Sequence, residues 1–155
     1  MKKSLPIITV GDLLDRVRKV EIRIERYCAK IRDQSQDNGL RLLTYYLARR
    51  RRRQDQTLPP LDRRQIERIR KARLPGDIVF DPDKLFPLLN ACPAEIMGGD
   101  LLQAAVNYQT ALVGLYRSIL QQPVIAAARP LLKSFIRVDE RDIVMLKKMS
   151  AMRYF

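Results

Sequence analysis

The sequence predicts an all-α protein and, within that class, a four-helix bundle of two antiparallel helix pairs joined by a long crossover. Apolar residues recur every three or four positions in four separate stretches, which is the period of an amphipathic helix. The 155 residues include only six glycines and no tryptophan. A chain of this length forms one domain with its own core. We therefore expect a single domain over 1–155, with helix pairs at 10–55 and 100–152 and a basic connection at 56–99.

The first helix is predicted to begin at a capping box. Thr9 is a typical N-cap residue, and Asp12, three positions later, can reach back to the cap. Glu21 is an acid within the apolar stripe that follows. The helix is expected to end in the polar turn at 34–39. The stripe consists of Leu13, Val17, Val20, Ile24, Tyr27, Cys28 and Ile31.

The second helix has an apolar face that runs into a row of five arginines. Its face contains Leu40, Leu43, Tyr46 and Leu47. The same face continues at Arg50 or Arg51 and then at Gln54, because helical neighbours lie three or four positions apart. The short turn before this helix predicts an antiparallel pair with the first one.

The connection between the pairs is predicted to contain one short, very basic helix. Pro59 and Pro60 precede it, and the helix is expected over 61–74, closed by Pro75 and Gly76. The strongest strand signal in the chain is the short run at 78–80.

The second helix pair also carries polar residues in its apolar stripes. The third helix is expected to start at Asp100, with Gln109 in the middle of its stripe. The fourth helix is expected from about Val124, with a bend or restart at Pro130, and its stripe is interrupted by two aspartates, Asp139 and Asp142.

The net charge of +13 is concentrated in the first half of the chain. Residues 1–76 carry 21 Lys and Arg but 9 Asp and Glu. Such a basic surface favours a polyanion or an acidic protein, although it can also serve only for solubility. The residues of a polyanion-binding surface would be Arg49, Arg52, Arg53, Arg63, Arg64, Arg68, Arg70, Lys71 and Arg73.

Cysteine usage and hydropathy indicate a cytoplasmic protein. Cys28 and Cys92 are too few and too far apart for a disulfide scaffold or a CxxC metal site. The apolar run near the N-terminus is shorter than a signal peptide requires. No stretch reaches the length of a membrane span, so we expect no membrane insertion.

The polar residues in the stripes resemble the ligand positions of the ferritin-like superfamily in its rubrerythrin-type form. Family members read Glu-x-x-Ala-x-x-Phe-Tyr on helices one and three, where this chain has Glu21-x-x-Ile24-x-x-Tyr27 and Gln109-x-x-Leu112-x-x-Leu115-Tyr116. The family's Glu-x-x-His pairs fall on Arg51 and Gln54, and on Asp139 and Asp142. The resemblance covers roughly residues 10–55 and 84–150. It implies a helical bundle with ligands from all four helices.

The departures from this pattern predict that no di-iron site forms and that the protein holds no cofactor. Such sites use four carboxylates and two histidines, and this chain has no histidine. A guanidinium cannot ligate metal and stays protonated. We therefore predict a buried polar layer in place of the metal, made of Glu21, Arg51, Gln54, Gln109, Asp139 and Asp142. Two alternatives stay open: these charges lie at the rim of the bundle, or three carboxylates hold one hard ion such as Ca²⁺ or Mn²⁺.

These observations favour a protein that is not an enzyme. Histidine-dependent nucleophilic catalysis is excluded, and no phosphate-binding glycine loop is present. The first hypothesis is a ferritin-like module that binds another protein or a second copy of itself. The second is a nucleic-acid-binding protein that uses the basic residues of 49–73. A divergent metal-dependent oxidoreductase is the least favoured, because its ligands are missing.

Overall fold

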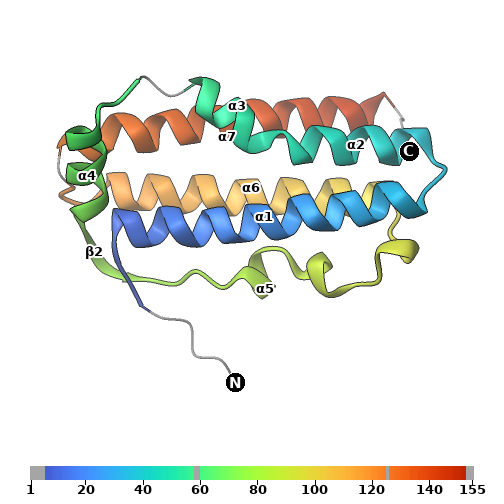
Figure 1. The fold of residues 1–155 in the computed structure, drawn as a ribbon, viewed down its shortest axis with the longest axis horizontal. Helices are drawn as coiled ribbons and strands as arrows, with labels where there is room; N and C mark the ends of the chain where they lie inside the picture. The colour runs from blue at the N-terminus through green and yellow to red at the C-terminus, as the bar shows by residue number, and fades with distance from the viewer. Residues whose placement is uncertain (1–5, 58–59, 125, 153–155) are drawn as a thin grey trace.

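The computed structural model describes residues 6–57, 60–124 and 126–152, and it is mostly helical (Figure 1). The helices are α1 (Val10–Gln34), α2 (Asn38–Ala48), α3 (Arg50–Thr57), α4 (Arg63–Lys71), α5 (Pro82–Leu85), α6 (Gly98–Leu120) and α7 (Arg129–Ala151). Short 3₁₀ turns are η1 (Pro87–Asn90), η2 (Pro93–Glu95) and η3 (Ala126–Ala128). Two strands, β1 (Ile7–Thr9) and β2 (Arg73–Ile78), complete the described elements.

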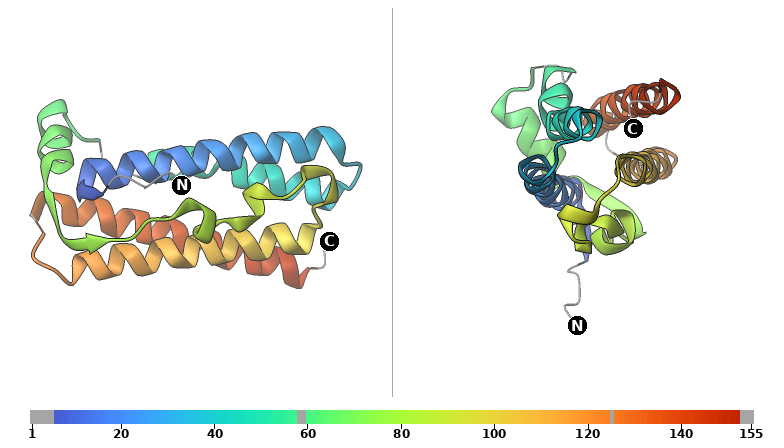
Figure 2. Two further views of the ribbon diagram at one scale, coloured as in Figure 1. Left: turned by 90° about the horizontal axis from the view of Figure 1, so that it is seen from below. Right: turned by 90° about the vertical axis from the view of Figure 1, so that its right-hand side faces the viewer.

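The long helices lie side by side along one axis (Figures 1 and 2). α1 packs against α2, and α6 packs against α7, while α2 also contacts α6 and α3 contacts α7. The segment from β2 through α5 to η2 runs back along α1 to the start of α6 (Figure 2). A hydrogen bond of 3.0 Å from the Tyr27 hydroxyl to the Ala91 carbonyl oxygen ties this segment to α1.

The start of α1 has the predicted capping box. The Thr9 hydroxyl accepts a hydrogen bond from the Asp12 amide at 3.1 Å, and the Asp12 carboxylate accepts one from the Thr9 amide at 3.0 Å. These bonds satisfy amides that a helix leaves free at its first turn. The backbone amides of Thr9 and Ile8 both donate to the Asp12 carboxylate and lower the pKa of Asp12 below its ordinary value, the Thr9 amide having the largest effect.

The predicted second helix is interrupted at Arg49. α2 ends at Ala48 and α3 begins at Arg50. The Arg49 amide donates to the Tyr46 and Leu47 carbonyls, and the Arg53 side chain donates from Nη1 to the same Tyr46 carbonyl at 2.7 Å. The carbonyls at the end of a helix have no partner within the helix and need such a donor. The Arg53 side chain, which follows about one turn after the end of α2, therefore caps its C-terminus.

The basic connection contains a shorter helix than predicted and a small sheet. α4 ends at Lys71 rather than near residue 74, and residues 73–78 instead pair with β1 in an antiparallel sheet. The paired residues are Ile7 with Ile78 and Thr9 with Arg73, with an irregularity between them. This small sheet was not predicted, because such short strands form through partners 64 to 71 residues away and have little pattern of their own.

The second helix pair begins close to the predicted positions. α6 starts at Gly98, two residues before Asp100. α7 starts only at Arg129, with Pro130 in its first turn, where proline is well tolerated. The predicted helical start near Val124 was therefore too early. The core forms where the apolar stripes meet, and Leu13, Leu43, Leu112 and Leu132 contribute one fully buried side chain from each long helix.

Across the described ranges, every helix is too short or too polar to span a lipid bilayer.

Candidate functional site

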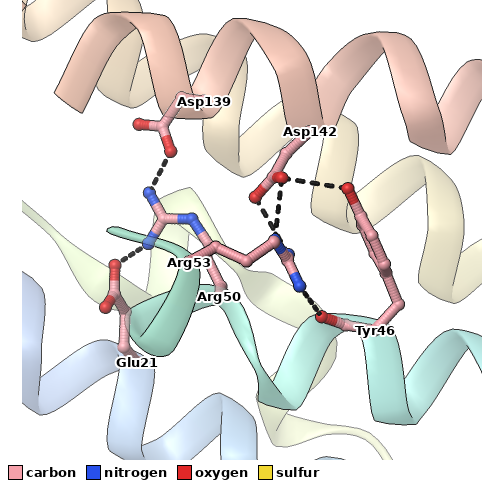
Figure 3. A network of polar contacts seen from close by, with 6 residues as sticks. All are labelled: Glu21, Tyr46, Arg50, Arg53, Asp139 and Asp142. Carbon is pink, nitrogen blue, oxygen red and sulfur yellow. Dashed lines mark hydrogen bonds and ion pairs between the residues drawn. The ribbon is translucent and has the colours of Figure 1, made fainter. Parts of the chain in front are cut away.

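The interior of the protein contains the guanidinium of Arg50. This side chain is 5% exposed and extends from α3 between α1 and α7 (Figure 3). Its Nη2 donates to Asp139 Oδ1 on α7 at 2.5 Å, and its Nη1 forms an ion pair with Glu21 Oε1 on α1. Charged hydrogen bonds of this kind are stronger than neutral ones. One arginine therefore links three helices.

A second arginine, Arg53, holds the neighbouring aspartate of α7. Its Nε and Nη2 each donate to one carboxylate oxygen of Asp142, both at 3.0 Å (Figure 3). The Tyr46 hydroxyl also donates to Asp142, at 2.9 Å. The Arg53 guanidinium lies 3.9 Å from the centre of the Tyr46 ring, which adds a cation–π contact. α2, α3 and α7 are thereby joined at one carboxylate.

The polar layer continues onto α6. Gln109 is 1% exposed there, and Gln54 of α3 is 8% exposed. The Arg50 guanidinium lies 5.6 Å from the centre of the Tyr108 ring. The hydroxyls of Tyr108 and Tyr116, together with Gln109 Oε1, are buried without a hydrogen-bond partner among the described residues. Arg50 Nε and Asp139 Oδ2 are likewise buried without a hydrogen-bond partner among the described residues, so spare bonding capacity lies on both the ion-paired side of the layer and its α6 side.

Burial controls the protonation of this layer. Burial alone would lower the pKa of Arg50, but the charge of Asp139, with smaller effects of Tyr108 and Tyr116, raises that pKa above its ordinary value. Burial raises the pKa of Asp139 to about 6, and the Arg50 charge limits the rise. Burial also raises the pKa of the Tyr108 and Tyr116 hydroxyls. At neutral pH the layer therefore combines a fixed guanidinium with neutral phenols.

Arg50 occupies the space between the carboxylates that a metal would need. It lies between Glu21 and Asp139, and Arg53 neutralises Asp142. Within the described residues, no three His, Cys, Asp or Glu side chains gather closely enough to hold an ion. The alternative of one hard ion held by Glu21, Asp139 and Asp142 is therefore not supported by the geometry. A guanidinium supplies only donors and cannot replace a ligand.

The prediction that Arg51 enters the interior was wrong. Its side chain is 33% exposed and makes two hydrogen bonds to Glu25 on α1, of 2.7 and 3.0 Å. The family motif places the ligand pair three residues apart, at Arg51 and Gln54, whereas the buried pair is four apart, at Arg50 and Gln54. At about 100° per residue, Arg50 lies about 40° from the mean direction of Leu43 and Leu47, and Arg51 about 60°. Helical phase alone favours Arg50.

The predicted basic surface is divided in the structure. Arg53 was expected to face solvent, but it binds Asp142 and its side chain is 26% exposed. Arg70 forms an ion pair with Asp15 at 2.8 Å. The remaining residues are exposed on α4 and beyond it, or on the outer side of α2 and α3; they are Arg49, Arg52, Arg63, Arg64, Arg68, Lys71 and Arg73.

The other predicted members of the layer are buried, but the prediction missed the tyrosines Tyr46, Tyr108 and Tyr116 in addition to Arg50 and Arg53. Glu21, Gln109, Asp139 and Asp142 are each at most 5% exposed. Tyr46 was expected only as part of the apolar face of its helix. Tyr46 on an apolar helix face gave no signal of its bond to Asp142, because that bond joins residues 96 positions apart.

Comparison of the chain with models of known families, with curated proteins and with solved structures gives no match. The chemistry of the site therefore rests on its own residues.

Proposed function

We propose that the chain is a ferritin-like four-helix bundle in which the Arg50 guanidinium replaces the metal ions, and that it acts as a non-catalytic module that binds another protein. The observation that supports this proposal is the position of Arg50, with a carboxylate of α1 on one side and a carboxylate of α7 on the other. Both acids are at positions that the family resemblance assigns to ligands.

The chemistry of the network favours a structural interior over a catalytic one. A metal centre works through an open coordination position and a bound water of lowered pKa. Arg50 offers neither, and its raised pKa prevents it from exchanging a proton at neutral pH. The network instead provides a positive charge that allows carboxylates to stay in the core. Function is then expected at the surface.

The spacing of the buried polar residues matches the family motif on α7 but not on α3. Asp139 and Asp142 on α7 have the spacing of the family motif, and both are buried. Arg50 and Gln54 on α3 are four apart, so the change from ligand to guanidinium also moved the inward position by one residue. The proposal includes this shift.

Metal analysis of the purified protein tests the proposal. We expect far less than one equivalent of iron or manganese per chain, including after incubation with Fe²⁺ or Mn²⁺ and removal of the unbound ion. Stoichiometric metal that remains through this treatment would refute the replacement of the site by Arg50. A metal-binding rubrerythrin-type protein that is treated in parallel serves as the positive control.

A second candidate function is polyanion binding through α4. The exposed side of this helix carries Arg63, Arg64, Arg68 and Lys71, and none of them forms an ion pair among the described residues. Four cations on one short helix form a surface suited to phosphate backbones. A salt titration of binding to mixed-sequence duplex tests this candidate.

A further inference from the structure

The outer edge of α2 and α3 exposes an unusual combination of side chains. Leu42 and Tyr45 are 48% and 45% exposed, and Arg49 and Arg52 follow them at helical spacing. We call these four residues the α2–α3 edge. They border a groove of about 380 Å³ that Tyr46, Arg53 and Gln56 also line. Apolar contact area therefore lies at one end of a continuous stripe, and positive charge lies at the other.

The charge of this edge is not balanced within the protein. The neighbouring arginines of the run are paired, Arg51 with Glu25 and Arg53 with Asp142. Arg49 and Arg52 form no ion pair with any described residue. The Arg32 guanidinium adds further positive charge, 4.5 Å from the centre of the Tyr45 ring. An acidic partner would meet complementary potential along the whole edge.

We infer that the α2–α3 edge binds an acidic amphipathic helix of another protein. This inference rests on the proposed function and names the class of partner. An apolar residue of the partner would cover Leu42 and Tyr45, while its carboxylates would meet Arg49 and Arg52. From Leu42 to Arg52 the edge spans about 15 Å at the helical rise of about 1.5 Å per residue, which matches about three turns of a partner helix. Helix-in-groove recognition uses anchors at this spacing.

The same observations disfavour the other occupants. A symmetric contact between two copies would bring two arginine-rich edges together, in a chain that already carries a net charge of +13. Nucleic acid would find one face of the Tyr45 ring occupied by Arg32, and the aliphatic Leu42 has no role in contacting a phosphate backbone. Single-strand binding depends on free aromatic faces.

A fluorescence anisotropy titration with a designed peptide tests the inference. The probe is a peptide of about 18 residues, or five helical turns, with leucine at every third or fourth position and glutamate elsewhere. We expect saturable binding. The Arg49→Ala/Arg52→Ala double variant should weaken it at least about tenfold, and Leu42→Ala should also weaken it. The matched controls, Arg63→Ala/Arg64→Ala on α4 and Val144→Ala on α7, should change the affinity less than about twofold.

Several outcomes would overturn the inference. They are no binding to the wild type, equal binding of a peptide with the same composition in scrambled order, and equal losses in the two arginine double variants. Displacement of the peptide by mixed-sequence duplex would assign the edge to nucleic acid instead. A dimer in sedimentation that Arg49→Ala/Arg52→Ala converts to monomer would assign it to a second copy. Metal content is measured on the same preparation: metal-free protein without peptide binding refutes only this edge, whereas stoichiometric metal refutes the proposed function.

Discussion

Arg50 and Arg51 are neighbours in the chain and identical in chemistry, and they have opposite environments. The Arg50 guanidinium is surrounded by α1, α7 and the Tyr108 ring, whereas Arg51 pairs with Glu25 in partial contact with solvent. Removing one partner of a buried ion pair strands the other charge in a medium that solvates it poorly. A partly exposed pair is screened by water and contributes little. The two positions therefore differ in what a substitution costs.

Arg50→Ala should lower the free energy of unfolding by about 3–5 kcal/mol, because Glu21 and Asp139 would stay buried without their cation. Arg51→Ala should lower it by at most about 1 kcal/mol. Urea unfolding at neutral pH measures both values. Equal losses in the two variants would contradict the assignment of Arg50 to the interior.

Asp139 should make the stability depend on pH. Burial raises its pKa from 3.8 to about 6 in the folded protein. Below pH 4 this carboxyl is protonated in both the folded and the unfolded state. Between pH 4 and 6 only the folded state keeps the proton, so the free energy of unfolding falls as the pH rises, by roughly 2–3 kcal/mol from this group.

The variant Asp139→Asn isolates that contribution. Urea midpoints of the wild type and of Asp139→Asn are compared from pH 4 to pH 7. We expect the stability difference between wild type and variant to change over this interval, with the wild type losing more as the pH rises. Parallel curves would show that Asp139 titrates at the same pH in both states.

At the scale of the elements, the features that could be predicted from the sequence are those that depend on residues close together in the chain. The capping box of Thr9 and Asp12 and the apolar stripes of the long helices are such features, because a helix is specified within a few turns. The pairing of β1 with β2 and the bond from Arg53 to Asp142 depend on residues far apart in sequence. Neither has a local pattern. Ideal helical phase favoured Arg50 over Arg51 by only about 20°, and the helix is interrupted at Arg49, while the spacing of the family motif favoured Arg51.

Two helical glycines, Gly11 and Gly114, differ in the space around them. A Cβ at Gly11 would lie 2.9 Å from the Arg70 carbonyl oxygen, whereas a Cβ at Gly114 in α6 would meet nothing within 4 Å. Alanine is favoured over glycine inside a helix by up to about 1 kcal/mol. We expect Gly114→Ala to raise the thermal midpoint and Gly11→Ala to lower it, since a backbone carbonyl cannot easily move away. Stabilisation of both variants would show that α4 is free to shift from α1.

At the scale of the whole molecule, the interior charges are paired, whereas the surface carries an excess of positive charge. The interior layer places Arg50 and Arg53 against Glu21, Asp139 and Asp142. Arg63, Arg64 and Arg68 of α4 and the arginines of the α2–α3 edge form no ion pair among the described residues, whereas Arg70 pairs with Asp15 at the surface. The charges in the interior therefore stabilise the packing of the helices, while the net positive charge of the chain is available to partners.

The salt dependence of duplex binding measures how many phosphates the cations of α4 neutralise. We expect the affinity for mixed-sequence duplex to fall with salt concentration, because each neutralised phosphate releases counterions. Arg63→Ala/Arg64→Ala should reduce the slope of log affinity against log salt by about two. Arg49→Ala/Arg52→Ala should leave that slope nearly unchanged. Undetectable binding at low ionic strength would rule out this second function.

The run of five arginines has a consequence for its tolerance of mutation. Two of its residues, Arg50 and Arg53, bind buried carboxylates, Arg51 forms a fork with Glu25, and Arg49 and Arg52 face solvent. Lysine keeps the positive charge but lacks the planar guanidinium that donates two parallel hydrogen bonds to a carboxylate. A lysine scan along the run should therefore be nearly silent at Arg49 and Arg52, show a small loss of stability at Arg51 and be costly at Arg50 and Arg53. Five identical residues in a row would then occupy three different environments: a buried ion pair, a partly exposed ion pair and the solvent.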